Sequence, residues 1–277
     1  MIEILLSLTA AICWALNGIA YRKGVAEVSA FTANFHRTLF ATLFFLPLAL
    51  FDLPKTEIDF NTAFVLVISA ILSFYIGDLS YFAALKRSPV SVALPASSTY
   101  PVYVVLLSTV VYGAKIQLNT FLSAFLVFIA VYVIYGSGKG KFRSSGLFFS
   151  LLAAFSWSLA ILTLDFLTDR LPVSVVAFTR MLLCLILLSF TVRRDEIKRR
   201  DSLIYAGIFG GFLSFAGIAV FLTAIKVSSS WNVVQPSATS PVFSAILGSI
   251  LLKEKIDFRL AAGIGIIVIS ILLLLLQ

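Results

Sequence analysis

The chain has 277 residues, of which 60% are hydrophobic and only 12% are charged, and its formal net charge is +8. A single soluble core cannot bury this much apolar surface, so the composition excludes a soluble globular domain. It predicts an all-α integral membrane protein, because uninterrupted apolar runs of about twenty residues cross a bilayer as helices.

Apolar runs of this length follow one another along the whole chain, and only short connections separate them. The ten predicted transmembrane helices cover residues 2–20, 31–51, 62–85, 90–112, 118–135, 146–167, 173–192, 203–225, 230–252 and 259–276. The first run has no basic segment before it and nine more runs after it, which favours a retained helix over a cleaved signal peptide.

Two polar or amphipathic residues lie deep in the first run. Trp14 and Asn17 are three residues apart and so share one helical face. Because an amide needs a partner in hydrocarbon, this face should point into the bundle, for an interhelical hydrogen bond or a substrate contact. Cys13 and Cys184 are on separate runs without a second cysteine nearby, and we interpret both as packing residues.

The second and third runs carry charges at similar predicted depth, Arg37 and Asp78. A lone aspartate inside a membrane costs about 3 kcal/mol, so Asp78 is a candidate functional residue. It could carry a coupling proton, contact the substrate, form a structural pair with Arg37 or a tyrosine (Tyr75, Tyr81), or line a solvated vestibule. His36 could shuttle protons, although a single histidine near an interface is more often a polar anchor.

The fourth and ninth runs contain a related polar stretch. Pro95 to Pro101 recurs in altered form as Pro236 to Pro241. Proline lacks an N–H and repels the carbonyl four residues back, so each helix should kink and leave one carbonyl unpaired. In a bilayer core such a carbonyl requires protein neighbours or a watery cavity, and both kinks are predicted near mid-membrane.

Hydroxyl, amide and aromatic side chains surround the two kinks. They suit a small amphipathic metabolite better than a bare ion, although serine and threonine can also merely close gaps between helices. In the fourth and ninth runs the candidates include Ser98 and Ser240, with Trp231 and Asn232. The full predicted cavity set is Trp14, Asn17, Tyr75, Asp78, Ser97, Thr99, Tyr100, Tyr103, Trp157, Gln235, Ser237 and Thr239.

An internal repeat relates the two halves of the chain. At an offset of 140 residues Pro101-Val102 falls on Pro241-Val242, and at 143 residues Trp14 falls on Trp157 and Arg37 on Arg180. Five runs per half is an odd number, so the halves, residues 1–138 and 139–277, should enter the membrane in opposite senses. Inverted repeats with a midplane site between them are typical of secondary transporters.

The second half does not copy the first completely. The offset places Ile218 where the first half has Asp78, so Arg180 needs another partner, and we expect Asp165 to provide it. Six glycines in the eighth and tenth runs indicate close helix packing: Gly207, Gly210, Gly211, Gly217, Gly263 and Gly265.

Basic residues in the connections predict the orientation. Fifteen lie in the odd-numbered connections and four in the even-numbered connections and nearby helix ends. The positive-inside rule then places the odd-numbered connections in the cytoplasm and both termini outside. The positive net charge is therefore a topology signal, and no folded basic surface for nucleic acid is expected.

Several other classes of protein are excluded. One histidine, two separated cysteines and few embedded acids provide no metal site and no nucleophile with its base, so no enzyme and no cofactor is predicted. The glycine-rich run at residues 136–141 lacks the first glycine and the final hydroxyl of a phosphate loop. A channel is disfavoured because neither a ring of like charges nor a repeated filter sequence is present.

The motifs together resemble one family. The chain looks like a member of the drug/metabolite transporter superfamily, EamA-type ten-helix branch. The motifs that carry the resemblance are Cys13-Trp14-Ala-Leu-Asn17, Phe35-His36-Arg37, Ala84-Leu85-Lys86, the two Pro-Val pairs and Lys253-Glu254-Lys255-Ile256. The resemblance covers the whole chain and implies a ten-helix carrier of amino acids or related metabolites, commonly an exporter coupled to an ion or proton gradient. Gly113-Ala114-Lys115 lacks the acidic residue that the family usually has after the fourth helix. Family members are also often drawn with both termini inside, against the charge count.

The sequence thus predicts a plasma-membrane transporter for a small-molecule substrate, with lipid around it and a coupling proton or ion as a further partner. The alternatives are a carrier of anionic metabolites such as nucleotide sugars or sugar phosphates, with Arg37 and Arg180 as clamps, or a lipid-linked sugar flippase.

Overall fold

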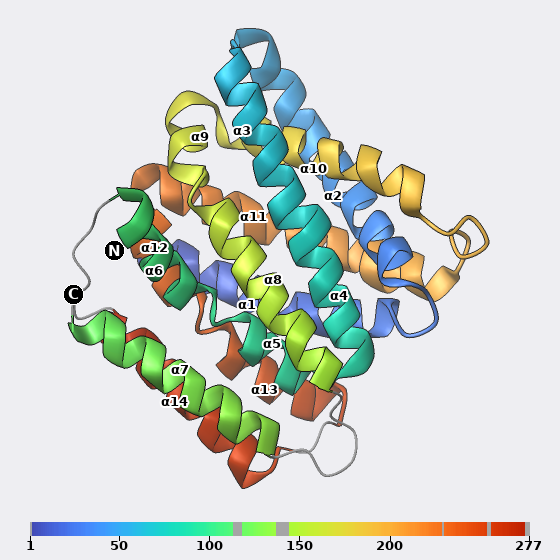
Figure 1. The fold of residues 1–277 in the computed structure, drawn as a ribbon. Coiled ribbons are helices and arrows are strands. Elements are labelled where there is room, and N and C mark those ends of the chain that lie inside the picture. Colours follow the sequence, from blue (N-terminus) through green and yellow to red (C-terminus); the bar gives the residue numbers. More distant parts are fainter. Residues whose placement is uncertain (1, 113–117, 137–143, 229, 254–255, 275–277) are drawn as a thin grey trace.

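In the computed structural model, residues 2–112, 118–136, 144–228, 230–253 and 256–274 are described, and every regular element in them is helical (Figure 1). The α-helices are α1 (Ile2–Gly24), α2 (Ala30–Asp52), α3 (Phe60–Ala70), α4 (Asp78–Arg87), α5 (Val90–Ser97), α6 (Tyr100–Tyr112), α7 (Leu118–Gly136), α8 (Ser144–Ile161), α9 (Leu164–Arg170), α10 (Val173–Thr191), α11 (Gly210–Val227), α12 (Ser230–Ser237), α13 (Ser240–Leu251) and α14 (Phe258–Leu274). A 3-10 turn, η1 (Leu53–Lys55), follows α2, and two π-helices, η2 (Ile71–Gly77) and η3 (Ser202–Phe209), lead into α4 and α11.

Seven continuous helical stretches within the described ranges are long and apolar enough to cross a bilayer. The apolar segments Ser240–Leu251 and Phe258–Leu273 are shorter. The predicted run 230–252 is divided between α12 and α13, which is why it does not form one long helix. The molecule is therefore a multi-pass membrane protein with many apolar side chains on its outer surface.

Proline, serine and aspartate residues set where helices begin. The Asp59 carboxylate accepts a hydrogen bond from the Thr62 N–H at 2.7 Å and so caps α3. Pro89 and Pro172 directly precede α5 and α10, where the extended conformation of each proline ends the preceding connection.

The fourth and ninth predicted runs are both interrupted. α5 ends at Ser97 and α6 begins at Tyr100, while α12 ends at Ser237 and α13 begins at Ser240. After each break the chain resumes with one turn of 3-10 type. The backbone N–H groups of Val102 and Val242 each donate to the carbonyl three residues back, at 3.1 Å. Pro95 and Pro236, by contrast, lie inside α5 and α12 without ending them.

Helices from the two halves pack against each other throughout the molecule. α2 packs against α10 and α7 against α14, each joining corresponding segments of the repeat, and α5 from the fourth predicted run packs against α13 from the ninth. α1 packs against α11, and α4 against α8. Figure 1 shows α7 and α14 running side by side at one edge of the bundle, with the other helices gathered beside them.

Glycines in the eighth predicted run permit close helix packing. A Cβ added to Gly211 would lie 2.6 Å from the Phe40 Cβ, and one added to Gly210 would lie 2.6 Å from the Tyr21 ring. Gly207 and Gly217 are similarly close to α2 and α1 side chains. The prediction of close helix packing is wrong for Gly265 on α14, where an added Cβ would meet nothing within 4 Å.

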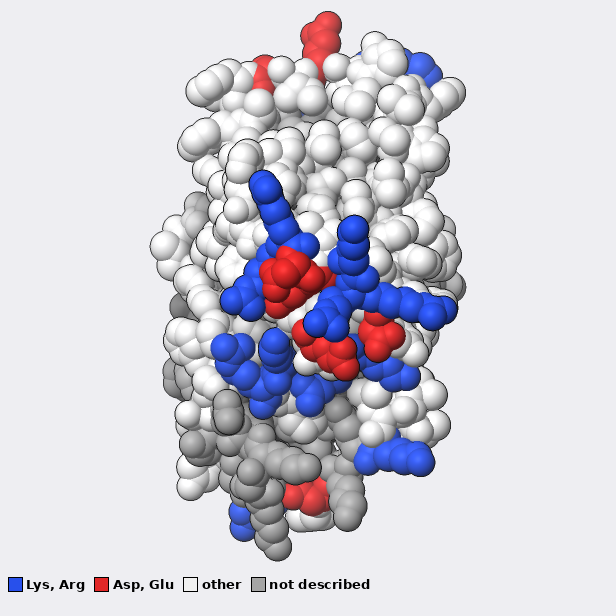
Figure 2. Space-filling view, turned by 90° about the vertical axis from the view of Figure 1, so that its right-hand side faces the viewer, with Lys and Arg blue, Asp and Glu red and all other residues white. Residues whose placement is uncertain are grey.

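Many charged side chains gather on one face of the molecule. Figure 2 shows basic and acidic side chains mixed across the middle of that face, with largely uncharged surface above them. A shallow groove there is lined by residues from both halves of the chain: Lys23, Gly24, Ala26, Glu27, Val28, Arg199, Arg200, Asp201 and Ser202.

The connection between α10 and η3 is fastened onto α2. The Glu196 carboxylate accepts the backbone N–H of Ser29 and the hydroxyl of Thr32, both at 2.7 Å. His36 is buried and contacts the Ile197 carbonyl through Nε2 at 2.9 Å and the Ser202 hydroxyl through Nδ1 at 2.8 Å. Because both ring nitrogens bind this connection, His36 is a structural anchor in this arrangement.

Candidate functional site

A cavity of about 130 Å³ lies where the two halves meet. It is bounded by side chains of α1, α2, η2, α4, α5 and α6 from the first half and of α8, α9, α10, α11 and α13 from the second. The lining residues are Trp14, Asn17, Tyr21, Arg37, Ser73, Phe74, Asp78, Tyr81, Leu94, Ser98, Tyr100, Trp157, Ile161, Leu164, Arg180, Ser214, Ile218, Phe221, Leu222 and Ser240. One water takes about 30 Å³ of liquid volume, so a cavity of this size has room for about four water molecules.

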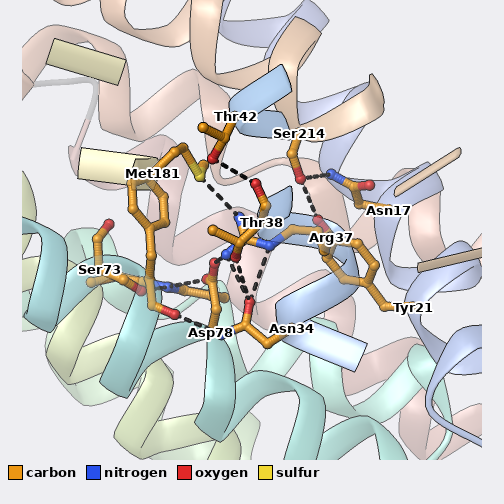
Figure 3. Close-up of polar contacts among 12 residues, drawn as sticks. Asn17, Tyr21, Asn34, Arg37, Thr38, Thr42, Ser73, Asp78, Met181 and Ser214 are labelled. Carbon is orange, nitrogen blue, oxygen red and sulfur yellow. Dashed lines mark hydrogen bonds and ion pairs between the residues drawn. The ribbon is translucent and has the colours of Figure 1, made fainter. Parts of the chain in front are cut away.

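The predicted ion pair is present in the cavity wall. Arg37 on α2 and Asp78 at the start of α4 are in direct contact through Nη2 and Oδ2 (Figure 3). Their side chains are 2% and 14% exposed, so the pair is shielded from solvent. The structural pairing that the sequence allowed is thus formed, and it occupies one side of the Asp78 carboxylate.

Neighbouring polar groups hold this ion pair from both sides. The Asn34 amide oxygen accepts two bonds from Arg37, from Nη2 at 2.8 Å and Nε at 3.1 Å. The other carboxylate oxygen of Asp78 accepts the indole N–H of Trp157 at 2.9 Å. Since Trp157 comes from α8, in the second half of the chain, the ion pair also joins the two halves.

The π-helix η2 makes these contacts geometrically available. In a π-helix the backbone bonds to the fifth residue back, and the Asp78 N–H reaches the Ser73 carbonyl in this way. Carbonyls in the widened turn also accept side-chain donors: Ser73 from Trp157 at 3.1 Å and Phe74 from Asn34 at 2.8 Å. The widened turn therefore receives donors from α2 and α8 immediately before Asp78.

A second polar cluster lies on the α1 side of the cavity. Figure 3 shows Ser214 of α11 between Asn17 and Tyr21 of α1. The Asn17 Nδ2 donates to the Ser214 hydroxyl at 3.4 Å, and the Tyr21 hydroxyl also contacts that oxygen. Trp14 lies beside them and packs edge-on against Phe221 with ring centroids 5.0 Å apart.

The two helix breaks meet at the cavity. The Ser98 hydroxyl of the first break lies 3.1 Å from the Ser240 hydroxyl of the second, and both residues line the cavity. The Tyr100 hydroxyl also crosses between the halves and lies 2.7 Å from the Ser237 hydroxyl. Polar groups from both interrupted helices are thus in contact with each other.

Five of the twelve predicted cavity residues line this space: Trp14, Asn17, Asp78, Tyr100 and Trp157. Ser97, Thr99 and Thr239 instead donate to carbonyls of their own helices, as small residues that close helix gaps do. Tyr75 packs against a cluster around Met181, and Tyr103 packs edge-on against Phe155 at 5.9 Å. Ser237 does not line the cavity itself, but its hydroxyl contacts that of Tyr100, which does. The Gln235 side chain lies outside the described residues.

Arg180 does not pair with Asp165 as the sequence suggested. Asp165 accepts the backbone N–H of Ser230 at 2.7 Å and contacts the Ser230 hydroxyl, so it holds the start of α12. Arg180 lines the cavity, where its guanidinium lies 4.7 Å from the centre of the Phe74 ring. The Arg37 guanidinium lies 5.3 Å from the centre of the same ring.

The prediction missed several lining residues. Tyr21 is four residues after Asn17 and seven after Trp14, so it shares their helical face and could have been found from the spacing. Ser73, Phe74 and Ser214 had no such signal, because the widened turn of η2 and the rotation of α11 determine their positions.

An apolar bundle with a cavity between its two halves, lined by aromatic and apolar side chains together with several polar and charged ones, is the arrangement expected of a membrane transport protein. Comparison with known proteins identifies the family: the EamA-like transporter family matches residues 1–136 and again residues 144–276, so the chain belongs to this family. The chain is also 73% identical over 276 residues, covering 100% of itself and 99% of the relative, to a protein of Archaeoglobus fulgidus named "Uncharacterized transporter".

A solved structure described only as "Crystal structure of protein" has the same fold. Its TM-score is 0.68 with 18% sequence identity, covering 99% of this chain and 98% of that one. The protein is therefore a multi-pass integral membrane transporter and not an enzyme, and it moves a small-molecule substrate across a membrane.

Proposed function

We propose that this protein is a secondary active transporter that exports small metabolites such as amino acids. In this proposal ten transmembrane helices form two inverted five-helix repeats, residues 1–138 and 139–277, and the substrate occupies the cavity between them. The single observation that carries the proposal is a cavity whose polar wall combines groups from both repeats. Carriers built from inverted repeats bind their substrates in this position.

The pairing of helices supports the inverted arrangement. Corresponding segments pack together as α2 with α10 and α7 with α14, and the corresponding fourth and ninth runs meet through α5 and α13. The contact of α1 with α11 is matched by that of α4 with α8, in which the roles of the two halves are exchanged. This reciprocity is expected when a two-fold axis relates the repeats, and rocking one repeat against the other would then expose the cavity alternately.

A carrier of anionic metabolites is the second candidate, because Arg37 and Arg180 both line the cavity. The Arg37 guanidinium is already engaged by Asp78 and Asn34, which leaves one guanidinium for an anion. A nucleotide sugar or sugar phosphate carries more negative charge than this, so the geometry favours the first candidate. A lipid-linked sugar flippase is a third option, which the closed aromatic walls around Trp14 and Phe221 support less well.

Counterflow in proteoliposomes tests the proposal. Purified protein is reconstituted into vesicles preloaded with one unlabelled amino acid or metabolite, and uptake of the same labelled compound is followed. We expect saturable, transient accumulation of at least one neutral amino acid, with an unchanged rate in an Arg194→Ala variant altered on the exposed connection. Flux that rises linearly with concentration would indicate a channel, and counterflow confined to nucleotide sugars or sugar phosphates would favour the second candidate.

A further inference from the structure

We infer that Arg180 and Asn17 form a two-point recognition site, at which Arg180 binds a substrate carboxylate and Asn17 accepts a hydrogen bond from a donor on the same molecule. The inference rests on the proposed transport function and narrows its substrate class to small amino or hydroxy carboxylates with an apolar side chain.

Arg180 is a buried cation that makes no ion pair within 4 Å in the part of the chain that the structure describes, although the Asp78 carboxylate, which is paired with Arg37, also attracts it electrostatically. Its side chain is 2% exposed, it lines the cavity, and its Nε has no hydrogen-bond partner. An isolated buried charge is costly unless it is paired and hydrogen-bonded. The Phe74 ring contributes a cation–π contact, which compensates for only part of this cost.

The charges along the cavity wall do not balance. Arg37 and Asp78 neutralise each other, and Trp157 occupies the second oxygen of that carboxylate. Among the described lining residues, Arg180 therefore adds one unbalanced positive charge. A ligand with a net charge of −1 would restore neutrality, and in a zwitterion the carboxylate would still pair with Arg180, because a guanidinium binds a carboxylate through two parallel hydrogen bonds.

Asn17 adds a hydrogen-bond acceptor to the same cavity, whereas the Arg180 guanidinium provides only donors. Its side chain is 4% exposed and its Nδ2 donates to Ser214, but its Oδ1 has no partner. A buried carbonyl oxygen left unbonded costs about 1–3 kcal/mol, so it is a site where a ligand donor would be stabilised. An ammonium, amine or hydroxyl group on the substrate would supply that donor.

The rest of the wall limits the size and polarity of the ligand. The aromatic residues Trp14, Tyr100 and Phe221 form a largely apolar surface, with Trp14 packed edge-on against each of the other two. A cavity of about 130 Å³ restricts the ligand to a small molecule. A small amino or hydroxy monocarboxylate with an apolar side chain meets all three conditions, whereas simple amines would be repelled by Arg180.

Three probes separate the two recognition points: L-leucine, 4-methylpentanoate, which lacks the amino group, and isoamylamine, which lacks the carboxylate. Binding to purified protein in detergent is measured by calorimetry. We expect the affinity for leucine to exceed that for 4-methylpentanoate by about tenfold and that for isoamylamine by a hundredfold or more, since hydrogen bonds to charged groups are worth about 1.5–3 kcal/mol.

Variants assign each point to its residue. Arg180→Gln should weaken leucine binding a hundredfold or more without weakening isoamylamine binding. Arg180→Lys should weaken leucine binding about tenfold. Asn17→Leu should weaken leucine binding about tenfold and leave 4-methylpentanoate binding unchanged. Arg180→Met should also unfold at an equal or higher temperature without ligand, because it removes an unpaired buried charge, whereas loss of a purely structural residue would lower that temperature.

Two results would overturn the inference: leucine affinity that survives in folded Arg180→Gln, or isoamylamine that binds wild-type protein as tightly as leucine does. Counterflow of compounds without a carboxylate would then leave the proposed transport function standing. Absence of saturable counterflow for every compound in the panel would contradict the transport proposal itself.

Discussion

At the scale of single residues, Asp78 is the most connected group of the cavity. It contacts Arg37 from α2 and accepts the Trp157 indole from α8, so one carboxylate links three helices. A coupling proton would have to displace these contacts. The arrangement therefore gives Asp78 a structural role whether or not it also takes part in coupling.

Replacement of Asp78 by asparagine should destabilise the folded protein by about 3–5 kcal/mol, because Arg37 would remain buried without its counter-charge. Thermal unfolding in detergent measures the effect. The double variant Arg37→Gln with Asp78→Asn serves as the control and should recover much of the loss. An unchanged unfolding temperature for Asp78→Asn alone would contradict the ion pair.

If Asp78 also carries the coupling proton, Asp78→Asn should impair gradient-driven transport more than counterflow. Counterflow needs no net proton movement, so a folded variant would retain it. Both activities are measured in the same proteoliposome preparation. Equal loss in the two assays would count against a coupling role for this carboxylate.

Glu196 predicts a dependence of stability on pH. Bonds from the Ser29 N–H and the Thr32 and Ser29 hydroxyls outweigh partial burial and lower the pKa of Glu196 to about 2. A lowered pKa in the folded state means that the stabilisation is present above the unfolded pKa near ~4.3 and is lost as the pH falls towards 2. Glu196→Gln should therefore cost about 2 kcal/mol at pH 7.

The check is a comparison of unfolding temperatures for Glu196→Gln and wild type from pH 7 to pH 3. The two curves should converge as the pH falls below 4. Asp195→Asn, altered one residue away on the exposed side of the same connection, is the matched control and should follow wild type at every pH. A constant difference across the range would show that Glu196 does not bind α2 as a carboxylate.

At the scale of the helices, glycines of α11 and α14 have opposite surroundings. Gly211 faces Phe40 and the α2 backbone, whereas Gly265 faces open space. Gly211→Ala should therefore destabilise the protein by about 1–3 kcal/mol through overpacking. Gly265→Ala, the matched control, should be neutral or stabilising, because alanine favours a helix by up to about 1 kcal/mol over glycine. Equal unfolding temperatures for the two variants would contradict the packing of α11 against α2.

The sequence predicted the helix breaks better than it predicted the faces of the helices. Proline chemistry is local, so Pro101 and Pro241 correctly marked where the fourth and ninth runs are interrupted. The rotation of each helix depends on packing, and these runs are apolar on all sides, so periodicity did not show which hydroxyls face inward. Ser98 and Ser240 line the cavity, while their neighbours Ser97 and Thr239 bond to their own helices.

At the scale of the molecule, connections from both halves converge on one charged face. The Lys86 ammonium donates to the Val28 carbonyl at 2.7 Å, and Glu196 binds Ser29, so three of the connections predicted to be cytoplasmic lie together. Lys55 and Arg170 lie at helix ends in the other predicted group of connections. Three of the five connections that the charge count assigns to one side are therefore in contact.

Labelling with an impermeant thiol reagent tests the orientation. In a background with Cys13 and Cys184 replaced by alanine, Arg194→Cys should be labelled only after the cells are opened, because its connection carries five basic residues. Lys55→Cys should be labelled on intact cells. The reverse pattern would place both termini inside, and labelling of both sites on intact cells would indicate dual orientation.

The unbalanced guanidinium of Arg180 also determines how membrane voltage would act on the transport cycle. An empty cavity would carry one positive charge, a bound monoanion would cancel it, and a bound zwitterion would leave it in place. A potential of 100 mV acts on one elementary charge with about 2.3 kcal/mol. For a monoanion the voltage would therefore drive only the return of the unloaded protein, whereas for a zwitterion both the outward and the return steps would move charge. Electrical recordings would then distinguish these two kinds of cargo without any label.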